Sequence, residues 1–335
     1  MQVMVFSAKT YERPFLEAAA ARHGQSAVFQ PLRLCRDTAS LAKTTPAVCA
    51  FVNDALDAET LGVLAGQGTT LIALRSAGFN HVDLKAAKKY GITVVRVPAY
   101  SPHAVAEHTL ALILALLRKL CRAHNRVREG NFSLDGLLGE GLYGKTVGIV
   151  GTGKIGEVVA QILRGFGCRL LGHDPSPSDE CKKLGMNYLD LPGLLEASDI
   201  VTLHCPLMPG TRHLIGDVEV QRMKPGTTLI NTSRGAVLDT RAVIRGLKSG
   251  RIGALGLDVY EEEEHLFFED FSGQIIQDDV FARLMTFPNV LITGHQGFFT
   301  REALETIADV TFRNVAEFEA SGACIHSVTC EKLVA

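Results

Sequence analysis

The turn Gly151-Thr152-Gly153-Lys154-Ile155-Gly156 is the feature that most constrains the fold of this chain. It follows the apolar run KTVGIV and opens a helical pattern, GEVVAQILRGFG, which is the context that a G-x-G-x-x-G fingerprint requires. Gly151 is expected to make the tight turn, Gly153 to let the backbone approach a pyrophosphate, and Gly156 to let the helix pack closely on the strand. The first amides of the helix then face the phosphates. A glycine-rich turn without a ligand is the alternative, but this context favours a dinucleotide site.

Asp174 indicates which dinucleotide such a site binds. It ends the next apolar run, CRLLGHD, 18 residues beyond Gly156, where a carboxylate can accept hydrogen bonds from ribose hydroxyls. The following residues, 175–178, include no arginine or lysine that could pair with a 2′-phosphate. NAD is therefore favoured over NADP. An Asp-Pro turn is the structural alternative for Asp174, and it is compatible with ribose binding.

Short apolar or β-branched runs alternate with helical patterns along the whole chain. The first set comprises residues 3–7, 26–30, 48–52, 70–76 and 92–98, and the second comprises residues 145–150, 168–174, 199–206, 226–233, 253–259 and 289–295. Such alternation predicts parallel strands joined by helical crossovers. The fold class is therefore α/β, with two doubly wound parallel-sheet domains and six strands in the second sheet.

The helical patterns indicate how these domains are connected. Ser101-Pro102 supplies an N-cap and a first-turn proline for a helix that is expected to run toward Gly130. The helical pattern from Arg301 to about Ala320 is too short to form a third domain, so we expect this helix to pack on the first domain. The prediction is a first domain of residues 1–100 plus 298–335, with an NAD-binding domain of residues 101–297 inserted in it.

The charge balance excludes several classes of partner. The formal net charge of −2 is not the basic excess that nucleic acid or an anionic membrane surface requires. The longest apolar run, residues 110–117, is far shorter than the roughly 20 residues that span a bilayer, and the N-terminus lacks the apolar core of a signal peptide. The eight cysteines form no CxxC pair, which is typical of reduced thiols in the cytoplasm. We expect a cytoplasmic protein with a small-molecule ligand.

Polar residues at the predicted strand ends are the candidates for chemistry, because ligands of open α/β sheets bind at the carboxyl ends of the strands. Arg234 can hold a carboxylate through two parallel hydrogen bonds, which the point charge of a lysine does not reproduce. His295 can exchange a proton with a hydroxyl or carbonyl oxygen, particularly beside a carboxylate that stabilises its charged form. The run Glu261 to Glu264 supplies such carboxylates. A surface ion pair and a capped strand end are the structural alternatives for the arginine and the histidine.

Six longer motifs read VPAYSPHAVAEHTLALIL, YGKTVGIVGTGKIG, DIVTLHCPL, MKPGTTLINTSRGAVLD, GALGLDVYEEE and NVLITGHQGFFT. Together they resemble the D-2-hydroxyacid dehydrogenases over essentially the whole chain. The resemblance implies a Rossmann NAD-binding domain inserted in a flavodoxin-like substrate domain. It also implies that Arg234 is the catalytic arginine, that His295 is the acid/base, and that Glu263, five residues after Asp258, is the catalytic glutamate.

Two departures from the usual family pattern narrow the range of substrates that we expect. Glu264 and Gly294 occupy positions where proline usually follows the glutamate and precedes the histidine, and residues 265–281 form a long insertion. These features look like the fermentative D-lactate dehydrogenase branch, which implies pyruvate and D-lactate as the substrate pair. Reduction of bulkier 2-keto acids such as phenylpyruvate or branched acids, and an NAD-sensing corepressor, are the alternatives. Glu261 and Glu262 are expected, with Glu264, to be solvated bystanders.

The resemblance also implies the remaining contacts. It implies NAD contacts within the glycine turn and at later strand ends, namely at Gly151, Gly153, Lys154, Ile155, Gly156, Asp174, Cys205, Pro206, Thr211, Thr232, Ser233 and Asp258. Substrate contacts are implied at Arg75, Ser76, Ala77, Gly78, Tyr100, Arg234, His295, Phe298 and Phe299. No metal site is expected, because the spacing of His265, Asp270, Asp278 and Asp279 fits no ligand template. A homodimer or homotetramer is expected, with the basic residues of 118–128 on a helix face at a subunit interface.

Overall fold

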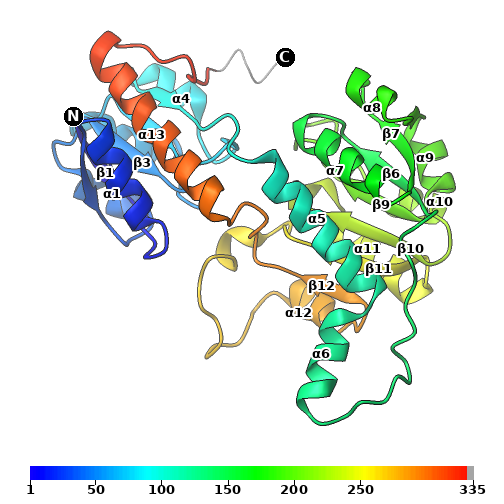
Figure 1. Ribbon diagram of the computed structural model, residues 1–335. Coiled ribbons are helices and arrows are strands. Elements are labelled where there is room, and N and C mark those ends of the chain that lie inside the picture. Colours follow the sequence, from blue (N-terminus) through cyan, green and yellow to red (C-terminus); the bar gives the residue numbers. More distant parts are fainter. Residues whose placement is uncertain (330–335) are drawn as a thin grey trace. The chain divides into compact units, whose positions relative to one another are not determined.

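The computed structural model describes residues 1–329, and the chain divides into two compact units (Figure 1). Unit 1 comprises Met1–Ser101 with Phe299–Ala335, and unit 2 comprises Pro102–Phe298. Each unit is built on one parallel sheet, of five strands in unit 1 and seven in unit 2. The α/β fold class predicted from the alternating apolar runs is confirmed.

Unit 1 contains the first five strands of the chain, all paired in parallel. The strands are β1 (Gln2–Val5), β2 (Ser26–Phe29), β3 (Ala47–Ala50), β4 (Leu71–Leu74) and β5 (Thr93–Val95). The helices are α1 (Arg13–Arg22), α2 (Arg36–Ala39), the 3-10 helix η1 (Ser40–Ala42), α3 (Ala58–Gly66), α4 (Leu84–Lys89) and α13 (Arg301–Ser321). The strand order β2-β1-β3-β4-β5 is that of a flavodoxin-like sheet.

Alternate residues of these strands pack into two hydrophobic clusters, one on each face of the sheet. Met4 and Val48 belong to the cluster that includes residues of α3 and α4. Val3 and Val5 belong to the cluster that includes Phe312 of α13. Because both faces are covered, β3 and β4 are buried at every position, which explains their continuous apolar sequences.

Unit 2 contains the remaining strands, again all parallel. The strands are β6 (Thr146–Val150), β7 (Arg169–His173), β8 (Asn187–Tyr188), β9 (Ile200–Leu203), β10 (Thr227–Asn231), β11 (Ile252–Leu257) and β12 (Val290–Ile292). The order β12-β11-β10-β9-β6-β7-β8 is that of a Rossmann sheet with one further strand. The prediction of six strands missed β8, because a strand of two residues shows no periodicity.

The helices of unit 2 cover its sheet and also form an arm that leaves it. They are α5 (Pro102–Leu117), α6 (Leu120–Arg128), α7 (Lys154–Gly165), α8 (Asp179–Lys183), α9 (Leu191–Ala197), α10 (Asp217–Arg222), η2 (Gly235–Val237), α11 (Thr240–Ser249), η3 (Glu263–His265) and α12 (Asp279–Met285). The single helix expected from residue 102 toward Gly130 is two helices. Lys119 has a positive φ of 53°, which interrupts the hydrogen-bond ladder where the apolar run ends.

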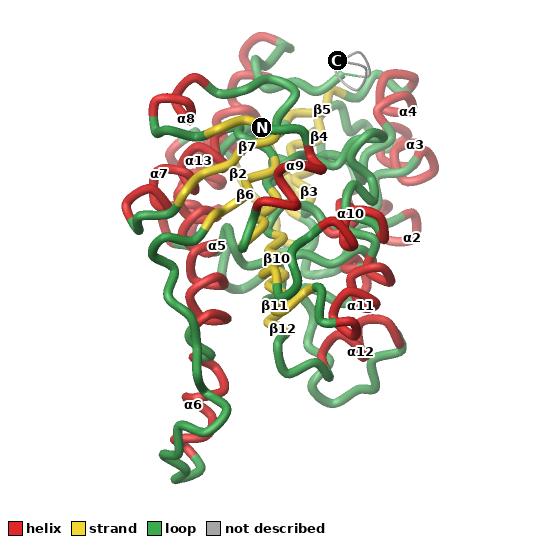
Figure 2. Tube along the Cα trace, turned by 90° about the vertical axis from the view of Figure 1, so that its right-hand side faces the viewer, coloured by secondary structure: helices red, strands yellow, loops and turns green. Residues whose placement is uncertain are grey.

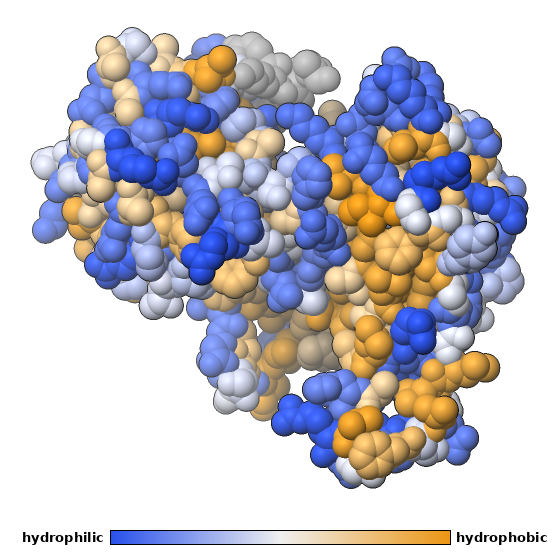
Figure 3. Space-filling view, viewed as in Figure 1, coloured by the Kyte–Doolittle hydropathy of each residue, from blue (hydrophilic) through white to orange (hydrophobic). Residues whose placement is uncertain are grey.

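Residues 120–143 form what we call the α6 arm, which projects from the seven-stranded sheet (Figures 1 and 2). No residue of α6 is buried, although the arm carries several large apolar side chains. Phe132, Leu134, Leu138 and Tyr143 are 75%, 81%, 88% and 86% exposed, and Figure 3 shows apolar side chains gathered there. None of the helices within residues 1–329 is long and apolar enough to cross a membrane.

Candidate active site

The turn after β6 places its glycines as a pyrophosphate site requires. Gly151 has a positive φ of 93°, and a Cβ there would lie 2.5 Å from a backbone nitrogen just beyond β9. A Cβ at Gly156 would lie 2.1 Å from the carbonyl oxygen of Gly151, so α7 packs on the strand as closely as its backbone allows. At Gly153, in contrast, the Cβ position faces open space. Lys154 and Ile155 begin α7 at this opening, where the helix amides are oriented to bind an anion.

Asp174 lies just beyond β7 and supports the glycine turn. Its Oδ2 accepts a hydrogen bond from the Thr152 amide at 2.7 Å, and its Oδ1 accepts one from the Ser176 amide at 2.8 Å. A carboxylate oxygen can accept a second hydrogen bond, so these contacts leave room for a ribose hydroxyl. Tyr188 on β8, which the sequence patterns missed, donates to Thr152 Oγ1 at 2.9 Å. The strand that was too short to predict therefore also supports the turn.

Two further loops at this edge of the sheet carry other predicted NAD contacts. Beyond β9, the buried Cys205 precedes a loop in which Thr211 Oγ1 donates to the Pro206 carbonyl at 2.6 Å. Beyond β10, the buried Thr232 shares a hydrogen bond of 2.8 Å between its Oγ1 and Thr109 Oγ1 of α5. Strand β9 lies between β6 and β10 in a parallel sheet, so both loops end at the same edge as the glycine turn.

His204, next to these contacts, is held in its neutral form. Its Nε2 lies 2.9 Å from Thr202 Oγ1, while its Nδ1 is shielded from solvent and has no partner among residues 1–329. Burial lowers the pKa of His204 to about 3. The same histidine in the unfolded chain binds a proton below about pH 6.5. Over the range between these values, only the unfolded state takes up the proton.

Acidification from about pH 7 to about pH 5 is therefore expected to destabilise the protein by about 2 kcal/mol through His204. The sign follows because proton uptake by the unfolded state lowers its free energy relative to the folded state. Urea unfolding of the wild type and of His204→Asn at both pH values tests this expectation. Between about pH 7 and pH 5, the free energy of unfolding of His204→Asn should fall by about 2 kcal/mol less than that of the wild type. An equal fall in both proteins would contradict the expectation.

His295 and Glu263 form a close pair near the ends of β11 and β12. The imidazole Nδ1 lies 2.8 Å from Glu263 Oε1, and the two side chains are only 17% and 16% exposed. A carboxylate only accepts hydrogen bonds, so Nδ1 carries a proton and Nε2 is left to exchange a proton with a ligand. Glu263 Oε2 accepts the Tyr260 amide at 2.9 Å, which orients the carboxylate. Phe268 and Phe298 flank the imidazole, with ring centroids 5.7 and 6.5 Å away.

Asp258, just beyond β11, holds the backbone that carries this histidine. Its buried carboxylate accepts hydrogen bonds from the amides of Gln296 and Gly297, both at 2.8 Å, and from Thr293 Oγ1 at 2.5 Å. His108 on α5, which the sequence patterns missed, lies 3.2 Å from the same carboxylate. Burial acts to raise the pKa of Asp258, but hydrogen bonds from His108 and Thr293 outweigh it and keep the pKa below its usual value. The Asp258 carboxylate is thus ionised and forms its hydrogen bonds within unit 2.

Arg234 lies in a half-buried loop beyond β10 that its neighbours hold in place. Asn231 Nδ2 donates to the Arg234 carbonyl at 2.8 Å, and Asn231 Oδ1 accepts from the amide and the hydroxyl of Ser233. Gly235 packs so closely that a Cβ there would lie 2.0 Å from the carbonyl carbon of Tyr260. The loop of the arginine and the loop of the glutamate run therefore meet backbone to backbone. Asn231 and Gly235 belong to the motif NTSRG, but their roles depend on these contacts.

The glutamate run is not uniformly solvated. Glu262 and Glu264 are exposed, as expected of bystanders. The prediction for Glu261 is wrong, because its side chain is only 16% exposed and is hydrogen-bonded to two other side chains. It accepts hydrogen bonds from His213 Nε2 at 2.5 Å and from Thr240 Oγ1 at 3.1 Å. Glu261 therefore ties the run to the start of α11.

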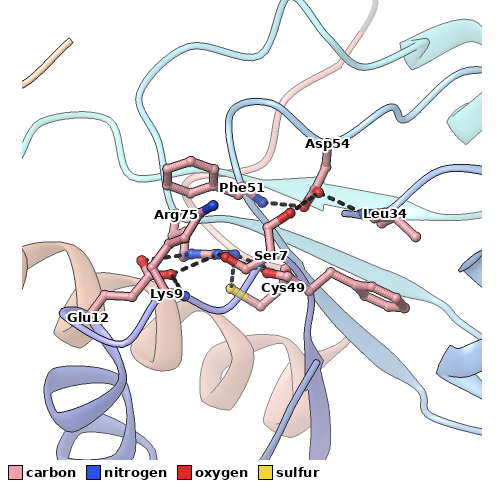
Figure 4. A network of polar contacts seen from close by, with 9 residues as sticks. Ser7, Lys9, Glu12, Leu34, Cys49, Phe51, Asp54 and Arg75 are labelled. Atoms are coloured by element: carbon pink, nitrogen blue, oxygen red, sulfur yellow. Dashed lines mark hydrogen bonds and ion pairs between the residues drawn. The ribbon is translucent and has the colours of Figure 1, made fainter. Parts of the chain in front are cut away.

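Arg75, just beyond β4, is buried within unit 1 (Figure 4). Its side chain is 1% exposed, and its guanidinium donates to the two carboxylate oxygens of Glu12 at 2.9 and 3.1 Å. Further hydrogen bonds reach the carbonyls of Phe6 and Ser7 at 2.8 and 3.0 Å. We correct the prediction of a substrate contact by this side chain, because its guanidinium is engaged in the interior. The ion pair joins the loops that follow β1 and β4.

The other predicted substrate residues are divided between the two units. Ser76, Ala77 and Gly78 form a half-buried loop at the carboxyl end of β4, the edge where α/β sheets bind ligands. The Phe299 ring lies edge-on to the Tyr11 ring, with centroids 4.8 Å apart. Unit 1 thus carries Ser76, Ala77, Gly78, Tyr100 and Phe299, and unit 2 carries Arg234, His295 and Phe298.

Comparison with known proteins agrees with this geometry. The family model described as D-isomer specific 2-hydroxyacid dehydrogenase, NAD binding domain, matches residues 110–297. The 2-hydroxyacid dehydrogenase A of Aspergillus oryzae is 52% identical over 99% of this chain and 96% of its own length. The D-lactate dehydrogenase of Escherichia coli is 48% identical over 97% of this chain and 98% of its own length. The glycine turn therefore lies in an NAD-binding domain.

A solved structure extends the similarity to both sheets. The D-lactate dehydrogenase of Aquifex aeolicus, complexed with NAD and lactic acid, has a TM-score of 0.85 to this chain. It is 36% identical, and the match covers 96% of each chain. The similarity thus includes unit 1 as well as the NAD-binding domain.

Proposed function

We propose that this chain, which belongs to the D-isomer specific 2-hydroxyacid dehydrogenase family, is an NAD-dependent D-lactate dehydrogenase. It catalyses the reversible reduction of pyruvate to D-lactate, with NADH as the hydride donor. The observation that carries the proposal is the pairing of His295 with Glu263 in the unit that binds NAD. The names of similar proteins, which include D-lactate dehydrogenases over the full length of the chain, support pyruvate as the substrate.

His295 is the acid/base of the proposed reaction. Bound NADH supplies a hydride to the carbonyl carbon of the keto acid. The Nε2–H of the protonated imidazole donates its proton to the carbonyl oxygen, so that one hydride and one proton convert the ketone into an alcohol. Glu263 holds the imidazolium through Nδ1 and stabilises its positive charge. In the reverse direction, the neutral imidazole accepts the hydroxyl proton.

Two groups are proposed to bind the carboxylate of the substrate. The planar guanidinium of Arg234 can form two parallel hydrogen bonds to it. The amides of Ser76 to Gly78 add further donors, which makes unit 1 the substrate domain. Glycine-turn residues, Asp174 and the loops beyond β9 and β10 hold the NAD, and Asp258 keeps the acid/base histidine in place.

NADH oxidation against a panel of 2-keto acids tests the proposed function. We expect kcat/KM to be highest for pyruvate and the product to be D-lactate, as identified by chiral chromatography. A higher kcat/KM for phenylpyruvate or branched keto acids would replace pyruvate with a bulkier substrate. A protein that oxidises NADH with none of these acids would refute a dehydrogenase and favour an NAD-sensing corepressor.

The α6 arm is proposed to bind a second copy of this chain in a homodimer or homotetramer. Exposed apolar side chains gathered on one surface mark protein interfaces more often than single exposed residues do. Arg126 Nη1 donates to the carbonyls of Ser133 and Asp135 at 3.0 and 2.8 Å, which ties α6 to the segment that follows it. An apolar surface on such an arm suits association between folded subunits.

Leu138→Asp is expected to weaken this association by about 30-fold or more, because it places a charge in the apolar interface. Light scattering across a concentration series measures the shift toward the monomer. Ile325→Asp is the matched control, since Ile325 is 80% exposed but lies outside the arm. A wild type that is monomeric at all concentrations, or equal behaviour of the two variants, would refute the interface.

A cytoplasmic location is also proposed. The seven cysteines within residues 1–329 are free thiols, which suits a reducing compartment. Fractionation with an antibody to the chain tests the location, and recovery from outside the cytoplasm would contradict it.

A further inference from the structure

We infer that Arg96 is a positioning residue for substrate binding: its guanidinium holds the Ala77-Gly78 peptide so that the Gly78 amide is presented to the substrate carboxylate. Arg96 lies just beyond β5 in unit 1 and is half-buried. The sequence patterns did not indicate a role for it. The inference rests on the proposed function, because it concerns how unit 1 binds the carboxylate of a 2-keto acid.

All three carbonyl oxygens of the loop are held by hydrogen bonds from within unit 1. The Val97 amide donates to the Ser76 carbonyl at 3.1 Å, and Ser76 Oγ donates to the Gly78 carbonyl at 2.8 Å. Arg96 Nη1 donates to the Ala77 carbonyl at 2.8 Å. In contrast, no acceptor within the described part of the chain pairs with the amides of Ala77 and Gly78. The loop therefore offers donors, and not acceptors, to a ligand.

The geometry of a peptide group links Arg96 to one of these donors. The Ala77 carbonyl and the Gly78 amide belong to one planar trans peptide, in which C=O and N–H point in opposite directions. By holding the oxygen, Arg96 fixes the direction of the N–H at the other end of the same group. A hydrogen bond from a cation also polarises the peptide, which makes its N–H a stronger donor to an anion.

The charge of Arg96 supports this assignment. Its guanidinium forms no ion pair with any residue of 1–329, and its polar contact is the neutral Ala77 carbonyl. The group lies over the Phe79 ring, 5.1 Å from the centroid, which holds it beside the loop. A half-buried positive charge without a carboxylate partner raises the potential of the loop and favours a bound anion.

Backbone contacts hold Arg96 independently of its guanidinium. Its carbonyl accepts a hydrogen bond from Asn314 Nδ2 of α13 at 2.9 Å, and its amide donates to the His326 carbonyl at 3.2 Å. A substitution of the side chain leaves both contacts available. It should therefore release the Ala77-Gly78 peptide without displacing β5.

The variant Arg96→Met tests the inference, because it removes the guanidinium and keeps an apolar side chain against Phe79. We expect KM for pyruvate to rise about tenfold, with kcat and the KM for NADH within about twofold of the wild type. The Kd of oxamate, an isostere of pyruvate, should weaken by the same factor in the presence of NADH, while the Kd of NADH stays unchanged. Arg96→Lys keeps the charge without the planar fork and should restore part of the affinity.

Arg13→Met is the matched control in the same unit. Arg13 also lies over a phenylalanine ring, 4.9 Å from the Phe29 centroid, but it pairs with Glu17 at 2.8 Å instead of a loop carbonyl. Its substitution should leave the binding of pyruvate, oxamate and NADH unchanged.

An unchanged pyruvate KM and oxamate Kd in Arg96→Met would overturn the inference. Equal weakening of oxamate and NADH binding would also overturn it, because that result indicates a general loss of structure. If Arg96→Met does not fold, Arg96→Lys is judged by the same criteria, with an expected rise in KM of about threefold. A wild type that reduces no 2-keto acid would refute the proposed function, whereas an active wild type with unaffected Arg96 variants would refute only the role of Arg96.

Discussion

Replacing Glu263 with glutamine is expected to lower kcat for pyruvate reduction by about 100-fold or more. Two donors, His295 Nδ1 and the Tyr260 amide, face the two carboxylate oxygens of Glu263. A glutamine has one oxygen to accept a hydrogen bond, so its NH2 group must face the other donor. The imidazolium also loses the negative charge that stabilises it. Steady-state NADH oxidation measures the loss.

The control for this prediction lies next to it in the sequence. Glu264 carries the same side chain but is exposed, so Glu264→Gln should retain kcat within about twofold of the wild type. A Glu263→Gln protein with a kcat close to that of Glu264→Gln would rule out a catalytic pair between Glu263 and His295.

Replacing Gly235 with alanine is expected to reduce both stability and activity. The new Cβ would lie 2.0 Å from the carbonyl carbon and 2.1 Å from the carbonyl oxygen of Tyr260, and a backbone cannot move aside as a flexible side chain can. Overpacking of this kind costs about 1–3 kcal/mol or more. The displaced loop carries Arg234, and a shift of about 1 Å in a catalytic group can cost about 100-fold in rate. Thermal denaturation and kcat/KM for pyruvate measure the two effects.

Gly165→Ala separates the steric effect from the loss of a glycine as such. Gly165 lies in the same unit, at the exposed end of α7, and its Cβ position faces open space. This variant should keep the melting temperature and kcat/KM of the wild type. The close contact with Tyr260 would prove unimportant if Gly235→Ala behaved in the same way.

Local features of the fold were predictable because each depends on neighbouring residues. A buried parallel strand requires several consecutive apolar residues, and a crossover helix requires its own periodicity, so the alternation of runs predicts both sheets. Strand β8 and the break at Lys119 were not predicted, because neither produces a periodic pattern. Two residues carry no period, and a single left-handed residue inside a helical pattern leaves no signal in it.

The sequence by itself determined the α/β class and the NAD-binding turn, and the resemblance it carries nominated Arg234, Glu263 and His295. Each of these rests on short motifs or on periodicity, which a chain displays before it folds. Only the tertiary structure decided that Arg75 is an interior ion-pair partner and that Glu261 is an anchored carboxylate. Their partners lie 63 and 48 residues away, respectively. Whether a charged side chain meets solvent, a ligand or a counter-charge depends on which distant segment packs against it. The order of the strands in the sheet determines which segments become neighbours.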